Sequence, residues 1–252
     1  MSSTQCESTD PCDVWGILGG MGPLASAEFV NTIYQEVIGG KEQEAPSVIL
    51  LSDPKMPDRT EFLLDGRSEV LLQRLTAGVE ALVAIGATRV IVCCMTIHPL
   101  IQRLHPHLRE KIVSLLDVTL EAVLRSSAEH LLLCTVGTRR LQLFQKHELW
   151  NQVQNQVILP DENDQRIIHE MLYAIKGQTE AKSYLSIVQG LMNKYAVQSY
   201  IAGCTEMHIV AKAQEKASGR DRREFCLDPL TEILPLINRS VPITAAALST
   251  RS

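Results

Sequence analysis

Two stretches of the chain, "IVCCMTIHP" at residues 91–99 and "YIAGCTEMH" at residues 200–208, share one pattern. In each, an apolar run ends in a cysteine, and a histidine follows four residues later. The resulting pairs are Cys94 with His98 and Cys204 with His208. Short apolar runs of this kind are typical of buried strands. Because open α/β sheets bind ligands outside the carboxyl ends of their strands, each cysteine is a candidate for chemistry at a cleft.

Short apolar runs alternate with helical patterns on both sides of these two stretches. Glycine, proline and polar residues separate the segments. This alternation predicts an α/β fold with mostly parallel sheets. The predicted strands are 14–20, 46–53, 88–94, 130–138, 156–161 and 197–204, and the predicted helices are 23–39, 68–86, 113–126, 164–177, 180–195 and 208–217.

The order of elements repeats along the chain. The predicted first strand ends near Gly19, 75 residues before Cys94, and the strand that ends near Thr135 lies 69 residues before Cys204. If two similar units face each other, the two cysteines meet across one cleft. We therefore predict a flexible tail at 1–13, a first α/β domain built from 14–115 plus 209–252, and a second from 116–208.

The composition sets limits on partners and location. The 252 residues are 45% hydrophobic and carry a net charge of −5, with no basic face, so a globular domain that does not bind nucleic acid is expected. No apolar run approaches the roughly 20 residues of a membrane span, and the polar start lacks the features of a signal peptide. Seven cysteines, an odd number, without a Cys-x2-Cys pair argue against a disulfide framework and a metal site. We therefore expect a cytoplasmic protein that binds no metal.

Cys94 and Cys204 each lie where a predicted strand gives way to a helix. The free N–H groups and partial positive charge of a helix N-terminus favour the thiolate form of a cysteine. The remaining cysteines in predicted strands or apolar segments, Cys93, Cys134 and Cys226, are interpreted as small buried hydrophobic residues.

The glycine loop "GILGGMGPLA" at residues 16–25 fits a relaxed G-x-G-x-x-A pattern. A dinucleotide-binding fold is therefore one possibility, with Asp53 at the end of the next strand as the acid for a ribose. Pro23 interrupts the turn, however, and a cysteine pair has no role in hydride transfer. We favour a loop that holds a small anion such as a carboxylate at the helix N-terminus.

Several polar residues have both a structural and a functional interpretation. Arg59 follows the second strand as either a surface arginine or a bidentate carboxylate clamp. Lys176 precedes Gly177 as either a helix-capping charge or a ligand contact. Thr135 and Thr138 in "CTVGT" fit a turn or a carboxylate-binding loop. His98, His208 and Glu206 fit the first turns of helices, with Glu206 as a cap.

Taken together, "GILGGMGPLAS", "PDRT", the Cys-x-Thr-x-His around Cys94 and "GCTE" at 203–206 resemble the cofactor-independent aspartate/glutamate racemase family. Within it the chain is most similar to the aspartate racemases, of the stand-alone type found beside cyanobacterial peptide synthetases. The resemblance covers about residues 14 to 235. It implies two Rossmann-like domains related by a pseudo-two-fold axis, with an active site between them. It also implies aspartate as substrate, no pyridoxal phosphate or other cofactor, and a homodimer.

The resemblance also assigns roles to residues. The catalytic pair falls on Cys94 and Cys204, the arginine that reads the side-chain carboxylate falls on Arg59, and a lysine with a related role falls on Lys176. Met95 replaces the asparagine of the family's Cys-Asn-Thr, which puts rate or substrate preference in question. The full set of predicted substrate-binding residues is Met21, Gly22, Pro23, Arg59, Thr96, Thr135, Thr138, Lys176 and Thr205.

A cysteine from each half has a physical reason in racemisation. A proton must leave one face of Cα and another must reach the opposite face, which two bases do directly. Without a pyridoxal sink, N–H groups and hydroxyls must stabilise the enediolate-like charge.

Three alternatives remain at this point. The first is a cysteine amidase or hydrolase that uses Cys204 with His208 or Glu206. The second is a related isomerase or decarboxylase of small dicarboxylates. The third is a two-lobed amino-acid binder without catalysis. The sequence also leaves aspartate, glutamate and methylaspartate undistinguished.

Overall fold

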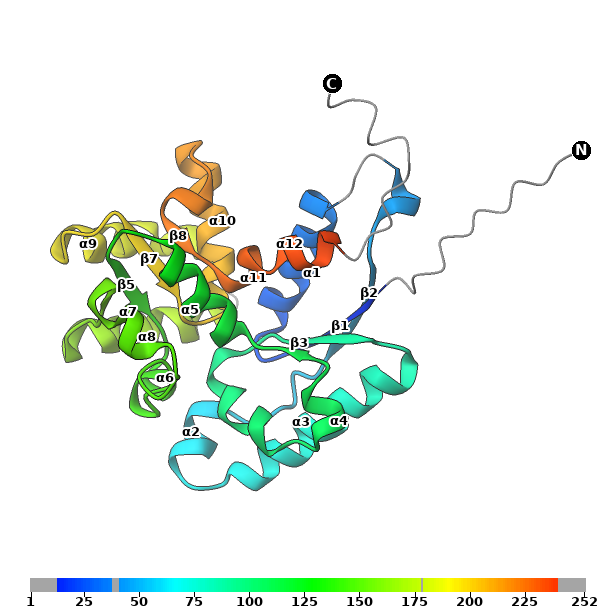
Figure 1. The fold of residues 1–252 in the computed structure, drawn as a ribbon. Helices are drawn as coiled ribbons and strands as arrows, with labels where there is room; N and C mark the ends of the chain where they lie inside the picture. Colours follow the sequence, from blue (N-terminus) through cyan, green and yellow to red (C-terminus); the bar gives the residue numbers. More distant parts are fainter. Residues whose placement is uncertain (1–12, 38–40, 178, 240–252) are drawn as a thin grey trace, which may run out of the picture.

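A computed structural model describes residues 13–37, 41–177 and 179–239, and its ribbon separates into two halves, each with its own sheet (Figure 1). Both sheets have four strands, all parallel, in the orders β2-β1-β3-β4 and β6-β5-β7-β8. We call the half with the first sheet the first lobe and the other the second lobe. The strands are β1 (Val14–Gly19), β2 (Ser47–Ser52), β3 (Arg89–Val92), β4 (Ile112–Val113), β5 (His130–Leu133), β6 (Val157–Ile158), β7 (Ser199–Ala202) and β8 (Cys226–Leu227).

The two sheets repeat one another. In each, the first strand in sequence pairs with the second on one side and with the third on the other. Strands β3 and β7 therefore occupy equivalent places, and Cys94 and Cys204 each lie two residues beyond the last strand residue. The predicted α/β fold of two Rossmann-like halves is confirmed.

Most helices begin and end at recognisable sequence signals. Helix α3 (Ser68–Ile85) buries Leu71, Leu75 and Val79, which recur every four residues, and it ends at Gly86 with φ of +114°. The other helices of ten residues or more are α1 (Pro23–Val37), α5 (Leu115–Arg125), α8 (Glu162–Lys176), α9 (Leu185–Lys194) and α10 (Glu206–Ser218). The shorter helices are α2 (Arg59–Leu64), α4 (Pro106–Arg109), α6 (Val136–Arg140), α7 (Trp150–Val153), α11 (Pro229–Glu232) and α12 (Leu234–Arg239). Short 3₁₀ segments are η1 (Glu42–Glu44), η2 (Met95–Arg103), η3 (Gln154–Gln156), η4 (Ala181–Tyr184) and η5 (Arg222–Glu224).

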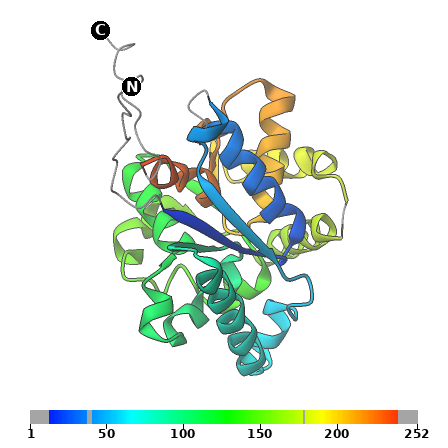
Figure 2. The ribbon, with the colours of Figure 1, turned by 90° about the vertical axis from the view of Figure 1, so that its right-hand side faces the viewer.

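One hydrophobic core is shared by the two lobes. It joins Trp15 and Phe29 of the first lobe to Leu132 and Phe144 of the second. Helix α1 also packs beside α10, seen as the dark blue and orange helices of Figure 2. Two further clusters fill the outer part of each lobe. The lobes are thus held together by apolar packing as well as by the chain that connects them.

The chain crosses between the lobes twice. Helix α5 follows β4 and leads into the second lobe, and α11 with α12 follows β8 and returns to pack on α1. The second sheet therefore extends to residue 227, because β8 pairs with β7. This differs from the expected boundary at residue 208. The expected tail at 1–13 lies almost entirely outside the described residues.

Within the described residues, none of the helices is both long enough and apolar enough to cross a membrane.

Candidate active site

Cys94 immediately precedes the 3₁₀ segment η2 and has an extended conformation, with φ of −164°. Its carbonyl oxygen lies 2.8 Å from Nδ1 of the buried His98, whose Nε2 accepts the N–H of Leu115 at 3.0 Å. These two bonds require a neutral ring with its proton on Nδ1. Burial lowers the pKa of His98 to about 4, consistent with that state. His98 therefore fastens the Cys94 loop to the start of α5 and does not serve as a base for the thiol.

Cys204 lies at the corresponding place in the second lobe, with 5% of its surface exposed. Its thiol donates a hydrogen bond to Oε2 of Glu206 at 2.8 Å. Burial raises the pKa of Cys204 well above its usual value, and the Glu206 carboxylate raises it further. The resting form of Cys204 is therefore the thiol.

Glu206 is a site residue that the sequence interpretation treated as a helix cap or, in the hydrolase alternative, as a partner of Cys204. Its side chain is 1% exposed, and Oε1 has no hydrogen-bond partner among the described residues. Gly22 makes room for it, because a Cβ at Gly22 would come within 2.4 Å of Oε1. The acid two residues after the cysteine in "GCTE" was the available signal, but a first-turn glutamate is common enough to hide it.

Arg59 is buried and not a surface arginine. It begins α2, and its guanidinium donates to the carbonyl oxygens of Met21 at 2.7 Å and Pro57 at 3.0 Å. Burial would lower its pKa, but interaction with Cys94 and the Asp58 carboxylate raises it above the usual value. Nε has no hydrogen-bond partner among the described residues. The side chain thus keeps a donor free beside Cys94.

Lys176 approaches the same site from the second lobe, as the last residue of α8. Its ammonium lies 4.9 Å from the ring centroid of Tyr173, whose hydroxyl donates to Oδ2 of Asp58 at 2.7 Å. Burial would lower the pKa of Lys176, but the Glu206 carboxylate raises it, and the sulfur atoms of Cys204 and Cys94 raise it further when they are ionised. Lys176 therefore has a place in the electrostatics of the site.

Buried threonine hydroxyls meet where the lobes touch. Oγ1 of Thr96 lies 3.2 Å from that of Thr135 and 3.1 Å from that of Thr138. Thr135 also caps α6, accepting the N–H of Thr138 at 3.2 Å. Thr205 Oγ1 donates to the Cys93 carbonyl at 3.4 Å, which again joins the two lobes. A cluster of hydroxyls therefore lies between the two cysteine loops.

Other predicted residues have different places. Met21 is buried and contributes its carbonyl to Arg59, whereas Pro23 is exposed at the start of α1. Met95 is 1% exposed and packs in the shared core.

The acidic residue that a dinucleotide-binding site would use for the ribose is not available. Asp53 forms a bidentate pair with Arg74, at 2.7 Å for the shortest contact, so its carboxylate is already occupied. Gly20 has a φ of +93° and lies against the Asp53 backbone, which explains this glycine through the fold alone.

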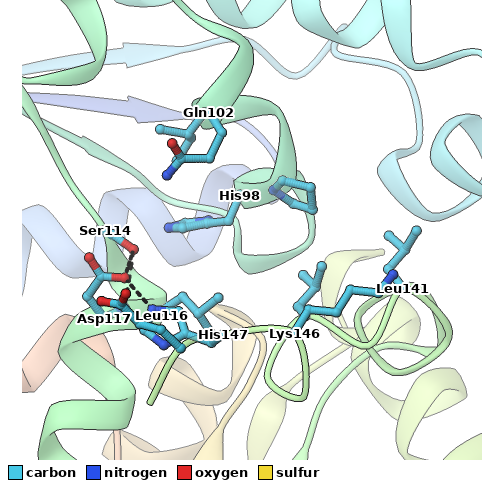
Figure 3. A pocket seen from close by; sticks show the side chains of 12 residues that line it. His98, Gln102, Ser114, Leu116, Asp117, Leu141, Lys146 and His147 are labelled. Atoms are coloured by element: carbon cyan, nitrogen blue, oxygen red, sulfur yellow. Dashed lines mark hydrogen bonds and ion pairs between the residues drawn. The ribbon is translucent and has the colours of Figure 1, made fainter. Parts of the chain in front are cut away.

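A separate cavity of about 530 Å³ lies beside the start of α5 (Figure 3). Ser114 and His147 both bond to Oδ1 of Asp117, at 2.9 and 2.8 Å. Neither site cysteine lines this cavity. Because Ser114 caps α5, these bonds order the crossover, and we do not assign the active site here. Within the described ranges, no group of three or more His, Cys, Asp or Glu side chains could hold a metal ion.

Comparison with known proteins bears on these features. A model of the Asp/Glu/hydantoin racemase family matches residues 18–230, most of the chain. The chain belongs to this family. Members are isomerases that act on amino acids or related compounds, and the fold agrees with their two-lobed architecture.

Solved structures of similar fold include racemases named for different substrates. Aspartate racemase of Picrophilus torridus has a TM-score of 0.76 at 20% identity, over 91% of this chain and 94% of that one. An aspartate racemase homologue from Pyrococcus horikoshii has a TM-score of 0.63 at 16% identity, over 90% and 98%. Glutamate racemase of Francisella tularensis, in complex with D-glutamate, has a TM-score of 0.57 at 14% identity, over 92% and 84%. At these identities the likeness describes the fold and leaves the substrate open.

Proposed function

We propose that this protein is an aspartate racemase that interconverts L- and D-aspartate with Cys94 and Cys204 as the two acid–base groups and without pyridoxal phosphate. The observation that carries the proposal is the placement of one cysteine at the end of each of two equivalent strands, β3 and β7. The resemblance to aspartate racemases supports the choice of substrate. A homodimer in the cytoplasm belongs to the same proposal.

The charges of the site suit an amino dicarboxylate. Arg59 from the first lobe and Lys176 from the second are the two cations of the site, and the carboxylates of Asp58 and Glu206 lie beside them. We assign the side-chain carboxylate to Arg59, where the free Nε donor is available. The α-carboxylate then lies with the threonine hydroxyls, which stabilise the negative charge that develops on its oxygens when Cα loses a proton.

The two sulfur atoms carry out the two proton transfers. In one direction the Cys94 thiolate takes the proton as the Cα–H bond breaks, and the electron pair moves into the α-carboxylate. The Cys204 thiol then donates its proton to the opposite face of Cα. The enzyme is left with a thiol at Cys94 and a thiolate at Cys204, which is the starting state for the other enantiomer. The raised pKa of Cys204 makes its thiolate a strong base once formed.

Glu206 and Lys176 act on this cycle through Cys204. The carboxylate accepts the thiol proton in a hydrogen bond and so orients it. When Cys204 becomes a thiolate, two negative charges lie side by side, and the ammonium of Lys176 offsets them.

A cysteine hydrolase is the second candidate, because the 2.8 Å bond joins Cys204 to a carboxylate. His208 is not available as its base: the ring is buried, with Nδ1 2.5 Å from Asp228 and Nε2 2.8 Å from Thr32. This candidate also leaves Cys94 and Arg59 without a role.

The test follows L-aspartate with the reduced protein in D2O, with no added cofactor, by circular dichroism and by NMR of the Cα proton. We expect optical activity to fall to zero while deuterium enters Cα. The double variant C94A/C204A should lose both signals, and C93A, which removes a neighbouring buried thiol, should keep them. Racemisation by the double variant would refute the cysteine pair. A flat trace with aspartate but decay with glutamate or methylaspartate would keep the reaction and correct the substrate.

A further inference from the structure

A second cavity opens on the second lobe, away from the cysteines. It has a volume of about 540 Å³ and is bounded by α6, the residues after β6 and the first turns of α8. Small-molecule sites commonly span about 300–1,000 Å³, so the size fits a metabolite. We call this cavity the arginine basin, because its lining includes Arg139, Arg140 and Arg166.

The charge of the basin is unbalanced. The three arginines carry three positive charges, and Glu162 is the only acidic residue among those that line it. In the described part of the chain, no carboxylate lies within 4.0 Å of any of these three guanidinium groups. Most of the other arginines, apart from Arg59, do have an acidic partner. The basin therefore keeps a net charge of about two positive units that the protein itself leaves unpaired.

Arg139 supplies an independent observation. Its Nη1 is shielded from water and has no hydrogen-bond partner in the described ranges. Nη2 reaches only the carbonyl oxygen of Pro160, at 3.5 Å. A buried donor without a partner destabilises the folded protein, and more strongly when the group is charged. An anion bound against the Arg139 guanidinium would balance its positive charge.

A simpler explanation is that Arg139 and Arg140 offset the dipole at the end of α6. It does not account for the basin, because α6 has only five residues and Arg166 comes from a different helix, α8. Guanidinium groups from two elements that converge on one cavity are the arrangement by which proteins bind phosphate and carboxylate groups.

We propose that the arginine basin is a binding site for a small dianion whose charge lies on phosphate or carboxylate oxygens. Two negative charges match the excess of the basin, and Arg139 donates from its inner wall while Arg140 and Arg166 donate from the exposed rim. The exposed Glu162 provides a carboxylate for a hydroxyl or amine of the same ligand. This site is separate from the two cysteines and does not depend on the proposed racemase activity.

The test is isothermal titration calorimetry of the full chain with inorganic phosphate and, separately, with succinate. We expect saturable binding of at least one probe, and the better probe identifies the class of oxygen that the basin prefers. R139Q and R140Q/R166Q should each weaken that binding at least tenfold. The double variant changes only exposed side chains, so it keeps the test valid if R139Q fails to fold.

The matched control is K41Q/K216Q, which removes the same two charges from exposed lysines that do not line the basin. It should bind the probe within about twofold of the unaltered protein, as screened charges at a distance contribute little. Equal weakening in the control would mean that only overall charge matters and would overturn the proposal. Absence of saturable binding by both probes would also overturn it.

Discussion

The loop after β3 and the loop after β7 carry the same Cys-x-x-x-His pattern but surround their cysteines differently. Cys94 has a guanidinium beside it, that of Arg59, whereas Cys204 has a carboxylate, that of Glu206, hydrogen-bonded to its thiol. The helical segment that follows each cysteine is also different in kind, since η2 is a 3₁₀ segment that contains Pro99 and α10 is a regular α-helix. Equivalent backbone positions thus hold two thiols in opposite electrostatic surroundings.

The two histidines, by contrast, do the same thing in both lobes. His98 bonds to the N–H of Leu115, the first residue of α5, and His208 bonds to Asp228, the cap of α11. Helices α5 and α11 are the two places where the chain crosses between lobes, and they pack on each other. The repeated motif therefore pairs a reactive residue with a fastening residue, and only the reactive residue has diverged in its surroundings.

The largest expected effect separates the two cysteines by the face of Cα that each serves. We expect C94A and C204A each to lower the racemisation rate by at least about 10³-fold, within the range for loss of an acid–base group. Each should still exchange the Cα proton of one enantiomer in D2O without inversion, and the two variants should do so with opposite enantiomers. NMR of each pure enantiomer measures this exchange. The same enantiomer exchanging in both variants would show that the cysteines do not face opposite sides.

The second prediction tests the fastening role of His208. H208A leaves the fully buried Asp228 carboxylate without its hydrogen-bonded partner, which should cost about 3 kcal/mol of unfolding free energy. Urea denaturation followed by circular dichroism measures the loss. The exposed His105 offers the control, and H105N should change stability by less than about 0.5 kcal/mol. Little change in H208A would mean that the crossover does not depend on this pair.

The third prediction tests the neutral state of His98 through the pH dependence of stability. Its folded-state pKa of about 4 lies below the ordinary value of 6.5, so the unfolded chain takes up the proton first as the pH falls. The stabilisation from the neutral ring is complete above about pH 6.5 and is lost as the pH falls to about 4, a change of roughly 3 kcal/mol at most. Stability measured in urea at several pH values should show this decline. H98N should flatten it within that window, and an unchanged slope would refute the assignment.

The fourth prediction concerns the carboxylate that distinguishes the Cys204 side. In E206Q the Cys204 thiol loses a charged hydrogen-bond acceptor, and we expect kcat/KM to fall about tenfold. Removal of the negative charge also lowers the pKa of Cys204, so the alkaline limb of the rate profile should move to lower pH. E224Q, which alters an exposed carboxylate, is the control. A limb that stays in place would mean that Glu206 does not act on the thiol.

The smallest expected effect is that of Tyr173, which lies between Asp58 of the first lobe and Lys176 of the second. Y173F removes the hydroxyl bond to Asp58, next to Arg59, but keeps the ring beneath Lys176. Loss of one such bond corresponds to about 1 kcal/mol, and we expect it as a rise of roughly fivefold in KM with kcat little changed. Steady-state kinetics with aspartate measures both, and Y34F, at an exposed position, should match the unaltered protein. A fall in kcat alone would place Tyr173 nearer to the chemistry.

Strands and helices long enough to show periodicity could be predicted from the sequence. The apolar spacing of α3 and the run that forms β3 are examples. Strands β4 and β8 have two residues each, too few for a pattern, so the sequence interpretation missed that the second sheet extends to residue 227. Pairing partners far along the chain, rather than local preference, define such strands.

Some features of the site could likewise be predicted from the sequence, and others could not. Cysteines at strand ends are visible because topology alone brings the carboxyl ends of equivalent strands to one edge. The burial of Arg59 and Glu206 was not visible, because each depends on contacts from a distant loop, with Met21 for one and the space at Gly22 for the other. The sequence does not distinguish a charged residue on a surface helix from a buried one in a site, because only the packing around the residue differs.

The shared core has a consequence for how the chain is made. Residues 130–227 build the second sheet as one continuous stretch, whereas the core that joins the lobes also needs Leu230, Ile233, Leu234 and Ile237. During translation these four residues leave the ribosome after every other part of that core. Until they arrive, the core that joins the lobes lacks part of its apolar packing. We therefore expect the two halves to complete their shared core only after the stretch around residue 237 has been synthesised.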